Sequence, residues 1–127
     1  MALVERWSIV ILDLDPVVGH EQAGQRRALV VSYEPFHRSG LATVCPITTR
    51  RTRYPGEVSI AAGTAGQTMD GVVLVHQVRT VDMRRVTASA IGGTARVLDD
   101  PRIRRDVRRA LAHHLGLDLP AAADGAA

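Results

Sequence analysis

The sequence contains few of the residues that a disulfide-bonded or lysine-rich protein would need. Cysteine occurs once, at Cys45, so a disulfide within the chain is impossible and a reducing compartment is expected. Aromatic residues make up only 3% of the chain, so the core must be built from aliphatic side chains. Lysine is absent, and every basic residue is an arginine.

Long apolar runs are also missing. Residues 1–14 lack the apolar run and small-residue cleavage site of a signal peptide, and no segment is long enough to span a membrane. We therefore expect a cytoplasmic protein. The five histidines and the single cysteine are scattered without the spacing of a metal site, and phosphate-loop and serine-elbow motifs are missing. We expect no metal and no other cofactor.

The composition is that of a globular protein. Hydrophobic residues account for 46% of the 127 residues and charged residues for 23%, which predicts one domain over 1–118 and a disordered tail over 119–127. The formal charge of +3 is too small to identify a partner. The arginine bias is typical of GC-rich coding sequence, but guanidinium groups also bind phosphates in a two-pronged fashion.

Short apolar, β-branched runs between glycine and proline turns predict an antiparallel sheet. The predicted strands are Ser8–Leu14, Ala28–Tyr33, Leu41–Thr48, Glu57–Ala61, Val72–Val78 and Thr87–Val97, with a short crossover over Arg79–Val86. The fifth run is almost entirely apolar, which favours a central position. Pro46 favours an edge position or a bulge for its strand, because proline cannot donate to a strand ladder.

One helix is predicted at the end of the domain. Asp99 or Asp100 can cap it, Pro101 suits the first turn and Gly116 can end it. Its apolar face contains Ile103, Val107, Ala110, Leu111 and His114 or Leu115, and arginines occupy the other faces. The pattern predicts a mainly β fold: a small, strongly bent antiparallel sheet or barrel with a helix packed on it.

The stretch 19–32 is a polar, glycine-bearing loop that ends in Arg26 and Arg27 and runs into an aliphatic strand. A strand-rooted loop can hold a charged group still for a ligand. RNA can be cut without metal, because its 2′-OH attacks the adjacent phosphate, given proton transfer and cationic donors. Arg26 suits charge stabilisation, and Thr48 at another strand end suits hydrogen bonding to the same phosphate. Taken alone, such residues are more often simply solvated.

Seven short motifs follow one another between Asp13 and Asp82. They are Asp13-Leu14-Asp15-Pro16, Gly19-x-Glu21-Gln22-Ala23-Gly24-x-Arg26, Ala28-Leu29-Val30-Val31-Ser32, Val44-Cys45-Pro46-Ile47-Thr48, Tyr54-Pro55-x-Glu57-Val58, Asp70-Gly71-Val72 and Gln77-Val78-Arg79-Thr80-Val81-Asp82. In order and spacing they resemble the MazF/PemK family of toxin endoribonucleases. The resemblance extends from about Glu5 to Leu115.

The resemblance implies a compact SH3-like barrel of the CcdB/PemK type and a homodimer. It implies metal-independent, sequence-specific cleavage of single-stranded RNA, especially mRNA, leaving a 2′,3′-cyclic phosphate and a 5′-OH. It also implies a cognate antitoxin, whose acidic, disordered segment folds onto the toxin and occupies the RNA groove.

The family's catalytic arginine falls on Arg26 and its catalytic threonine on Thr48. We assign charge stabilisation to Arg26, because guanidinium holds its proton too tightly to be a good base. Glu21 could fix Arg26 by a salt bridge, act as the base, or only stabilise the loop. His20, where many members have serine, could supply the acid or base, or be an exposed loop histidine.

Further residues are candidates for RNA binding or for supporting the site. They are His20, Glu21, Gln22, Thr49, Arg50, Arg51, Arg53, Tyr54, Gln77 and Arg79. For the arginines after Thr49 a solvated loop is the alternative, and for Gln77 and Arg79 packing at the barrel end or dimer interface. Four aromatic residues, Trp7, Tyr33, Phe36 and Tyr54, could stack on a base. Trp7 and Tyr33 are expected in the core, and Tyr54 is the candidate for recognition.

The sequence departs from the family pattern at Arg27, where proline is common, and at Arg6-Trp7-Ser8, where Arg-Gly-Asp or Arg-Gly-Glu is usual. Two other functions stay open. One is a non-enzymatic toxin that binds a protein target such as gyrase through the same fold, and the other is a degenerate member kept as a binding module. The first of these predicts an activity that does not depend on Arg26 and Thr48.

Overall fold

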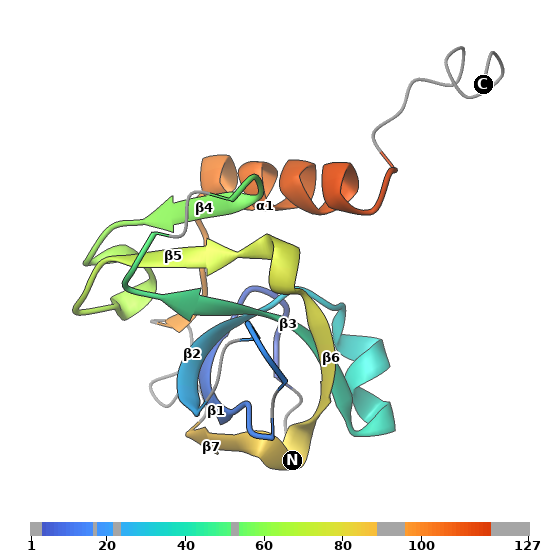
Figure 1. Ribbon diagram of the computed structural model, residues 1–127. Coiled ribbons are helices and arrows are strands. Elements are labelled where there is room, and N and C mark those ends of the chain that lie inside the picture. The colour runs from blue at the N-terminus through green and yellow to red at the C-terminus, as the bar shows by residue number, and fades with distance from the viewer. Residues whose placement is uncertain (1–3, 17, 22–23, 52–53, 89–95, 118–127) are drawn as a thin grey trace, which may run out of the picture.

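Seven strands in the described part of the chain pair into one antiparallel sheet, in the order β4-β5-β3-β2-β1-β7, with β6 also paired to β3 (Figure 1). The structure, a computed structural model, describes residues 4–16, 18–21, 24–51, 54–88 and 96–117. The strands are β1 Ile9–Asp13, β2 Gln25–Val30, β3 Leu41–Thr48, β4 Glu57–Ile60, β5 Gly71–Leu74, β6 Arg79–Asp82 and β7 Val86–Ala88, and the α-helix is α1 Pro101–His114. The predicted mainly β fold with a C-terminal helix is confirmed. The sheet is bent but not closed, since β4 and β7 do not pair with each other within the described residues.

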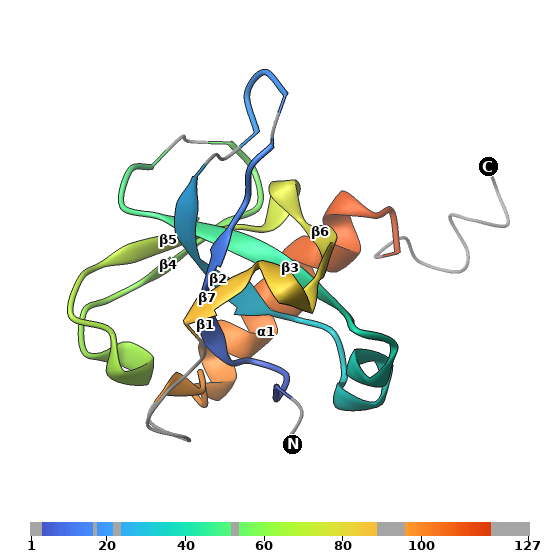
Figure 2. The ribbon, with the colours of Figure 1, turned by 90° about the horizontal axis from the view of Figure 1, so that it is seen from below.

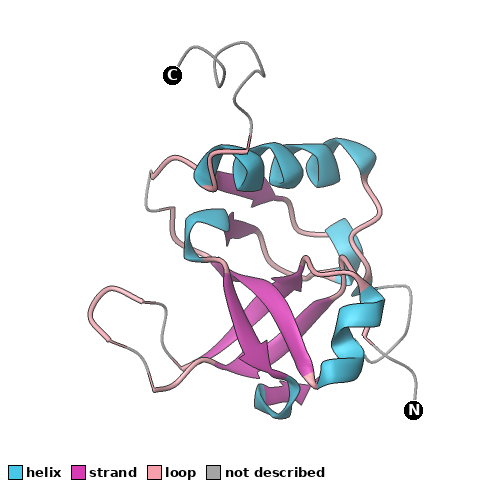
Figure 3. Cartoon of the chain, turned by 90° about the vertical axis from the view of Figure 1, so that its right-hand side faces the viewer, coloured by secondary structure: helices cyan, strands magenta, loops and turns pink. Residues whose placement is uncertain are grey.

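Alternating side chains of the bent sheet build two apolar cores. The first, which α1 covers, contains Trp7, Ile9, Leu29, Cys45, Ile47, Val58, Ile60, Val73, Val75, Leu98 and Val107. The second, on the opposite face, contains Val10, Leu12, Leu14, Ala28, Val30, Ala42, Val44 and Val81. Figure 3 shows α1 lying across the top of the strands. Each fully buried aliphatic side chain contributes about 1.5–3 kcal/mol, so an aliphatic core suffices despite the lack of aromatics.

Helix α1 begins and ends as its sequence predicts. The Asp100 carboxylate accepts hydrogen bonds from the backbone N–H groups of Arg102, at 2.9 Å, and Ile103, at 3.4 Å. Gly116 adopts a left-handed φ of 72° after the last turn. Val107 is buried and Ile103, Ala110 and Leu111 pack against the first core. His114 and Leu115 are exposed, so their alternative placement on the apolar face was wrong.

The predicted strand Val72–Val78 is interrupted. It ends at Leu74 and gives way to a 3-10 turn, η3 Val75–Gln77. β5 then pairs with the end of β3 at Ile47 and Thr48, and β6 pairs with its beginning at Leu41–Val44. The two strands therefore share one side of β3, and η3 separates them. The prediction of a crossover over Arg79–Val86 was wrong, because β6, the turn η4 Met83–Arg85 and the start of β7 occupy it.

Pro46 lies in an interior strand, so the predicted edge position was wrong. It pairs with Ala28 of β2 on one side. On the other side the partner of β3 changes from β6 to β5, and in the described strands neither Cys45 nor Pro46 has a partner there. A missing N–H is tolerated where no ladder requires it.

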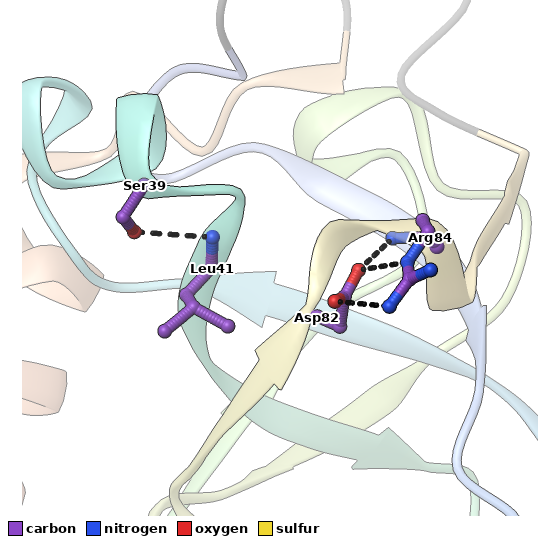
Figure 4. A network of polar contacts seen from close by, with 4 residues as sticks. All are labelled: Ser39, Leu41, Asp82 and Arg84. Carbon is purple, nitrogen blue, oxygen red and sulfur yellow. Dashed lines mark hydrogen bonds and ion pairs between the residues drawn. The ribbon is translucent and has the colours of Figure 1, made fainter.

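The turn between β6 and β7 is held by Asp82 (Figure 4). Its carboxylate accepts from the Arg84 backbone N–H at 2.8 Å and from the Arg84 guanidinium at 3.0 Å. The hydrogen bonds from Arg84 lower the pKa of Asp82 below its usual value. Nearby, the Ser39 hydroxyl accepts from the Leu41 N–H at 3.2 Å.

Two predictions fall wholly or largely on residues outside the described ranges. The strand predicted over Thr87–Val97 is present as the end of β7, and Val97 forms an isolated bridge with Ser8, but 89–95 lie outside the description. The tail predicted over 119–127 lies outside it altogether.

Candidate functional site

The loop between β1 and β2 is fixed at its root. The Leu14 N–H donates to the Gly24 carbonyl at 2.9 Å, and the Gly24 N–H donates to the Asp15 carboxylate at 3.0 Å. Arg85 donates to the Asp15 carbonyl, and Arg79 reaches the Leu14 carbonyl at 3.5 Å. Gly24 has a φ of 70°, which favours glycine. These hydrogen bonds fix the base of the loop directly before β2, the strand that carries Arg26.

Arg26 and Thr48 lie on neighbouring strands at the same end of the sheet. Arg27 pairs with Ile47, so the next position in the same register brings Arg26 opposite Thr48. Opposed residues of an antiparallel pair project to one face. Both line an open hollow of about 500 Å³, the first hollow, whose walls are Gln25, Arg26, Arg27, Ile47, Thr48, Thr49 and Arg50.

Neither functional group of this pair is consumed by the fold. Among the described residues, the exposed guanidinium of Arg26 has no hydrogen-bond or ion-pair partner. The Thr48 hydroxyl oxygen accepts from the Arg50 N–H at 3.2 Å, so its proton stays available for donation. A free guanidinium beside a free hydroxyl proton is a binding site for a tetrahedral anion.

Arg27, the next residue, points to the other face and is tied into the protein. Its guanidinium donates to the Gln67 side chain at 3.2 Å and to the carbonyls of Met69, at 3.4 Å, and Asp70, at 2.9 Å. Burial lowers the pKa of Arg27. A Cβ on Gly71 would lie 2.9 Å from this guanidinium, so the packing there is close. The departure from the family pattern at Arg27 thus has a structural role.

Five of the predicted supporting residues meet in a second hollow of about 600 Å³. It is lined by Leu14, Val18, His20, Glu21, Pro46, Tyr54, His76, Gln77, Val78 and Arg79. Figure 2 shows the β1–β2 loop, the β3–β4 loop and η3 gathered at one end of the molecule. Pro46 lines the second hollow whereas Ile47 and Thr48 line the first, so the two hollows adjoin along β3.

Glu21 braces its own loop. Its carboxylate accepts from the Val18 N–H at 2.6 Å, and its backbone N–H donates to the Val18 carbonyl at 3.3 Å. Within the described residues it forms no ion pair with Arg26. His20 is exposed beside it, in the second hollow rather than the first.

The β3–β4 loop is anchored by Glu57. One carboxylate oxygen accepts from the Tyr54 N–H at 3.2 Å, and the other lies 3.7 Å from the Arg51 guanidinium. The side chain of Glu57 is only 3% exposed. Tyr54 itself is 65% exposed, and its ring lies 5.3 Å, centroid to centroid, from that of His76.

His76 is the site residue that sequence reasoning missed. It lies in η3 within an apolar run, and a lone histidine there was the only available signal. Burial is the main cause that lowers its pKa, opposed by the charge of Glu57. The expectation that Tyr33 is a core residue was wrong: it is 55% exposed, with the Arg6 guanidinium 5.8 Å from its ring centroid. Trp7 is buried as expected.

The remaining predicted residues divide between the two hollows and the undescribed ranges. Thr49 and Arg50 line the first hollow, and Gln77 and Arg79 line the second. Gln22 and Arg53 lie outside the described residues. Over the described ranges, no group of three or more histidine, cysteine or acidic side chains could hold a metal ion. The same ranges contain no helix long and apolar enough to cross a membrane.

Sequence comparisons agree with the motifs. A family model described as PemK-like, MazF-like toxin of type II toxin-antitoxin system matches residues 5–115. The chain is 42% identical over 91 residues to Endoribonuclease toxin ChpB of Escherichia coli (strain K12), an alignment that covers 69% of this chain and 78% of ChpB. It is 39% identical over 88 residues to Endoribonuclease EndoA of Bacillus subtilis (strain 168), covering 67% and 76%.

Solved structures share the fold. MazF (Form-I) from Deinococcus radiodurans superposes with a TM-score of 0.75 at 32% identity, covering 91% of this chain and 99% of that chain. MazE-MazF (Form-II) from the same organism gives 0.70 at 31% identity, covering 93% and 100%. The resemblance inferred from seven motifs is confirmed.

Proposed function

Since the chain belongs to the family of PemK-like, MazF-like toxins of type II toxin-antitoxin systems, we propose that it is an endoribonuclease that cuts single-stranded RNA, mRNA in particular, at a specific short sequence. One observation supports this most: the Arg26 guanidinium, without a partner among the described residues, lies opposite Thr48 in an open hollow. Related proteins are named endoribonucleases, which supports the same reaction class.

In the proposed reaction the RNA 2′-oxygen forms a bond to the adjacent phosphorus, and the bond from phosphorus to the 5′-oxygen breaks. The products are a 2′,3′-cyclic phosphate and a 5′-OH, and no metal takes part. Arg26 stabilises the extra negative charge on the phosphorane oxygens, and the Thr48 hydroxyl donates a hydrogen bond to one of them. Donors already in place need no reorganisation during the reaction, so it matters that Arg26 has no hydrogen-bond or ion-pair partner in the described part of the chain.

Two groups remain for proton transfer. The Glu21 oxygen that does not accept from Val18 can take the 2′-OH proton, while His20 can give a proton to the 5′-oxygen. Both line the second hollow, which adjoins the first. A pH–rate profile that is unchanged in His20→Ala would exclude His20 as the general acid. The profile of Glu21→Gln tests Glu21 as the general base in the same way.

The proposal includes partners. MazF of Deinococcus radiodurans has been solved in complex with MazE. By analogy, a cognate antitoxin with an acidic, disordered segment would bind this chain over the arginine-bearing hollows and exclude RNA. We further propose that the active form is a homodimer and works in the cytoplasm.

The test is cleavage of a long single-stranded RNA in excess chelator, with the cut ends mapped. Wild type should make discrete cuts, and Arg26→Ala and Thr48→Ala should make none at matched concentration. Arg84→Ala is a matched control, because that arginine is 91% exposed and belongs to neither hollow. Cuts that persist equally in the Arg26 and Thr48 variants would exclude this site and favour a toxin that binds a protein target.

A further inference from the structure

The second hollow contains two neighbouring rings, those of Tyr54 and His76. Neither has a role in the proton transfer or phosphate binding proposed above. We propose that Tyr54, supported from behind by His76, is a stacking platform for the nucleobase next to the phosphate that is cut. The inference rests on the proposed cleavage of RNA and adds to it the position at which a base is held. Tyr54 touches the base, and His76 positions Tyr54.

The platform is fixed before any ligand arrives. The backbone N–H of Tyr54 donates to the Glu57 carboxylate at 3.2 Å, and Glu57 is a nearly buried residue at the start of β4. Its second oxygen lies 3.7 Å from Arg51, which ties a further part of the same loop to the sheet. An aromatic residue ordered in advance loses little entropy on binding.

His76 supports the tyrosine ring. The two ring planes are inclined by 41° with centroids 5.3 Å apart, while 65% of the tyrosine surface stays open. In the described structure, His76 Nδ1 is buried without a hydrogen-bond partner. A proton there would be an unsatisfied buried donor, which favours a neutral ring with its lone pair on Nδ1. A neutral imidazole packs against an aromatic face without bringing a charge into the hollow.

The two hollows lie side by side along β3. Pro46 lines the hollow that contains Tyr54, and Thr48 lines the hollow that contains Arg26. Alternate residues of a strand project to the same face about 7 Å apart. The spacing of Pro46 and Thr48 along β3 is comparable with one nucleotide step of extended RNA, so the proposal assigns to Tyr54 the base next to a phosphate held at Arg26.

Stacking on an open aromatic face accepts any base, and in single-strand binding it is a strong contribution to affinity. The platform therefore predicts a position where removal of the base weakens binding whichever base was present. This separates it from a hydrogen-bonding pocket, in which only one base would be sensitive.

The experiment is a scan with short RNA substrates in which each nucleotide around the cut is replaced in turn by an abasic one. For wild type we expect KM to rise about tenfold at one position adjacent to the cut, with kcat little changed. Tyr54→Ala should raise KM for the intact RNA and lose the sensitivity at that position alone. Tyr54→Phe should keep it, and His76→Ala should reduce it. Tyr33→Ala is the matched control, an exposed tyrosine beside Arg6 that lines neither hollow.

The proposal is overturned if Tyr54→Ala keeps the wild-type sensitivity at every position, or if Tyr33→Ala produces the same loss. Binding of the same RNAs to Arg26→Ala, followed by fluorescence anisotropy, separates the two proposals. If the wild-type protein binds RNA in a way that depends on Tyr54 but never cuts it, the proposed endoribonuclease activity is contradicted and the proposed base stacking on Tyr54 is supported. If the protein cuts RNA but no position of the RNA depends on Tyr54, the endoribonuclease activity is supported and the base stacking is contradicted.

Discussion

The neighbouring residues Arg26 and Arg27 of β2 lie on opposite faces of the sheet and differ in the partners that they find there. On one face Arg27 is held by Gln67 and by the carbonyls of Met69 and Asp70. On the other face, within the described residues, Arg26 has no partner and borders an open hollow. A charged side chain satisfied by its own protein contributes to folding, whereas one left free on a rigid strand is available to a ligand.

The alternation of side chains along a strand causes this difference. The segment between β4 and β5 covers the face of Arg27, so its donors meet carbonyls that would otherwise lack partners. Arg26 is exposed on the other face. Two arginines of identical chemistry thus differ in role because one residue step turns a side chain to the other face.

The largest expected effect comes from removing the free arginine. Arg26→Ala should lower cleavage by about 10²–10³-fold, because a preorganised donor to the phosphorane is lost. Its free energy of unfolding should stay within about 0.5 kcal/mol of wild type, because among the described residues the exposed side chain has no hydrogen bond or ion pair to lose. Single-turnover cleavage and urea denaturation measure the two quantities. A large loss of stability would show that Arg26, like Arg27, contributes to the stability of the fold.

Thr48 should behave like Arg26 with a smaller effect. Thr48→Val keeps the shape of the side chain and removes the hydroxyl, so cleavage should fall by about 10–100-fold. Thr48→Ser keeps the hydroxyl and should retain most of the activity. The rate of cutting at saturating RNA measures the effect. Equal activity of the valine and serine variants would exclude hydrogen bonding as the role of Thr48.

Arg27 should show the reverse pattern. Arg27→Ala leaves Gln67 and two carbonyls without their donor and should lower the free energy of unfolding by about 1–3 kcal/mol. Although Arg27 also lines the first hollow, its guanidinium is held by Gln67 and Asp70, so cleavage per folded molecule should change by less than about threefold. Urea denaturation combined with active-fraction titration distinguishes the two effects. If cleavage falls as far as in Arg26→Ala while stability holds, Arg27 belongs to the site.

The smallest effect concerns a covered histidine. Burial lowers the pKa of His76 in the folded protein below that of the unfolded chain, about 6.5. As the pH falls below about 6.5, the unfolded chain binds this proton first, so the folded protein loses stability. In His76→Gln the free energy of unfolding should fall less steeply between pH 7.5 and 5. Urea denaturation at several pH values measures this slope. The other histidines are common to both proteins, and identical slopes would contradict the prediction.

Much of the fold follows from local pattern. Strands β1, β3, β4 and β5 and helix α1 fall within the predicted runs, apart from their ends, because alternation, turn residues and the Asp100 cap act locally. The strand predicted over Ala28–Tyr33 was displaced, because β2 begins at Gln25, inside the predicted loop, and ends at Val30. The interruption at η3 and the strand β6 do not follow from local pattern, because they depend on which part of β3 each segment meets. Pro46 was misplaced for the same reason, since only the change of partner along β3 makes a proline acceptable there.

The sequence by itself determined the family, the aliphatic cores, the helix and the pairing of Arg26 with Thr48 as candidates, because motif order and periodicity are properties of the chain alone. Only the tertiary structure decided which arginine is free, how the supporting residues divide between two hollows, and that His76 stands behind Tyr54. Those outcomes depend on what covers each face. Coverage comes from segments distant in sequence, such as Gln67 over Arg27 or His76 against Tyr54.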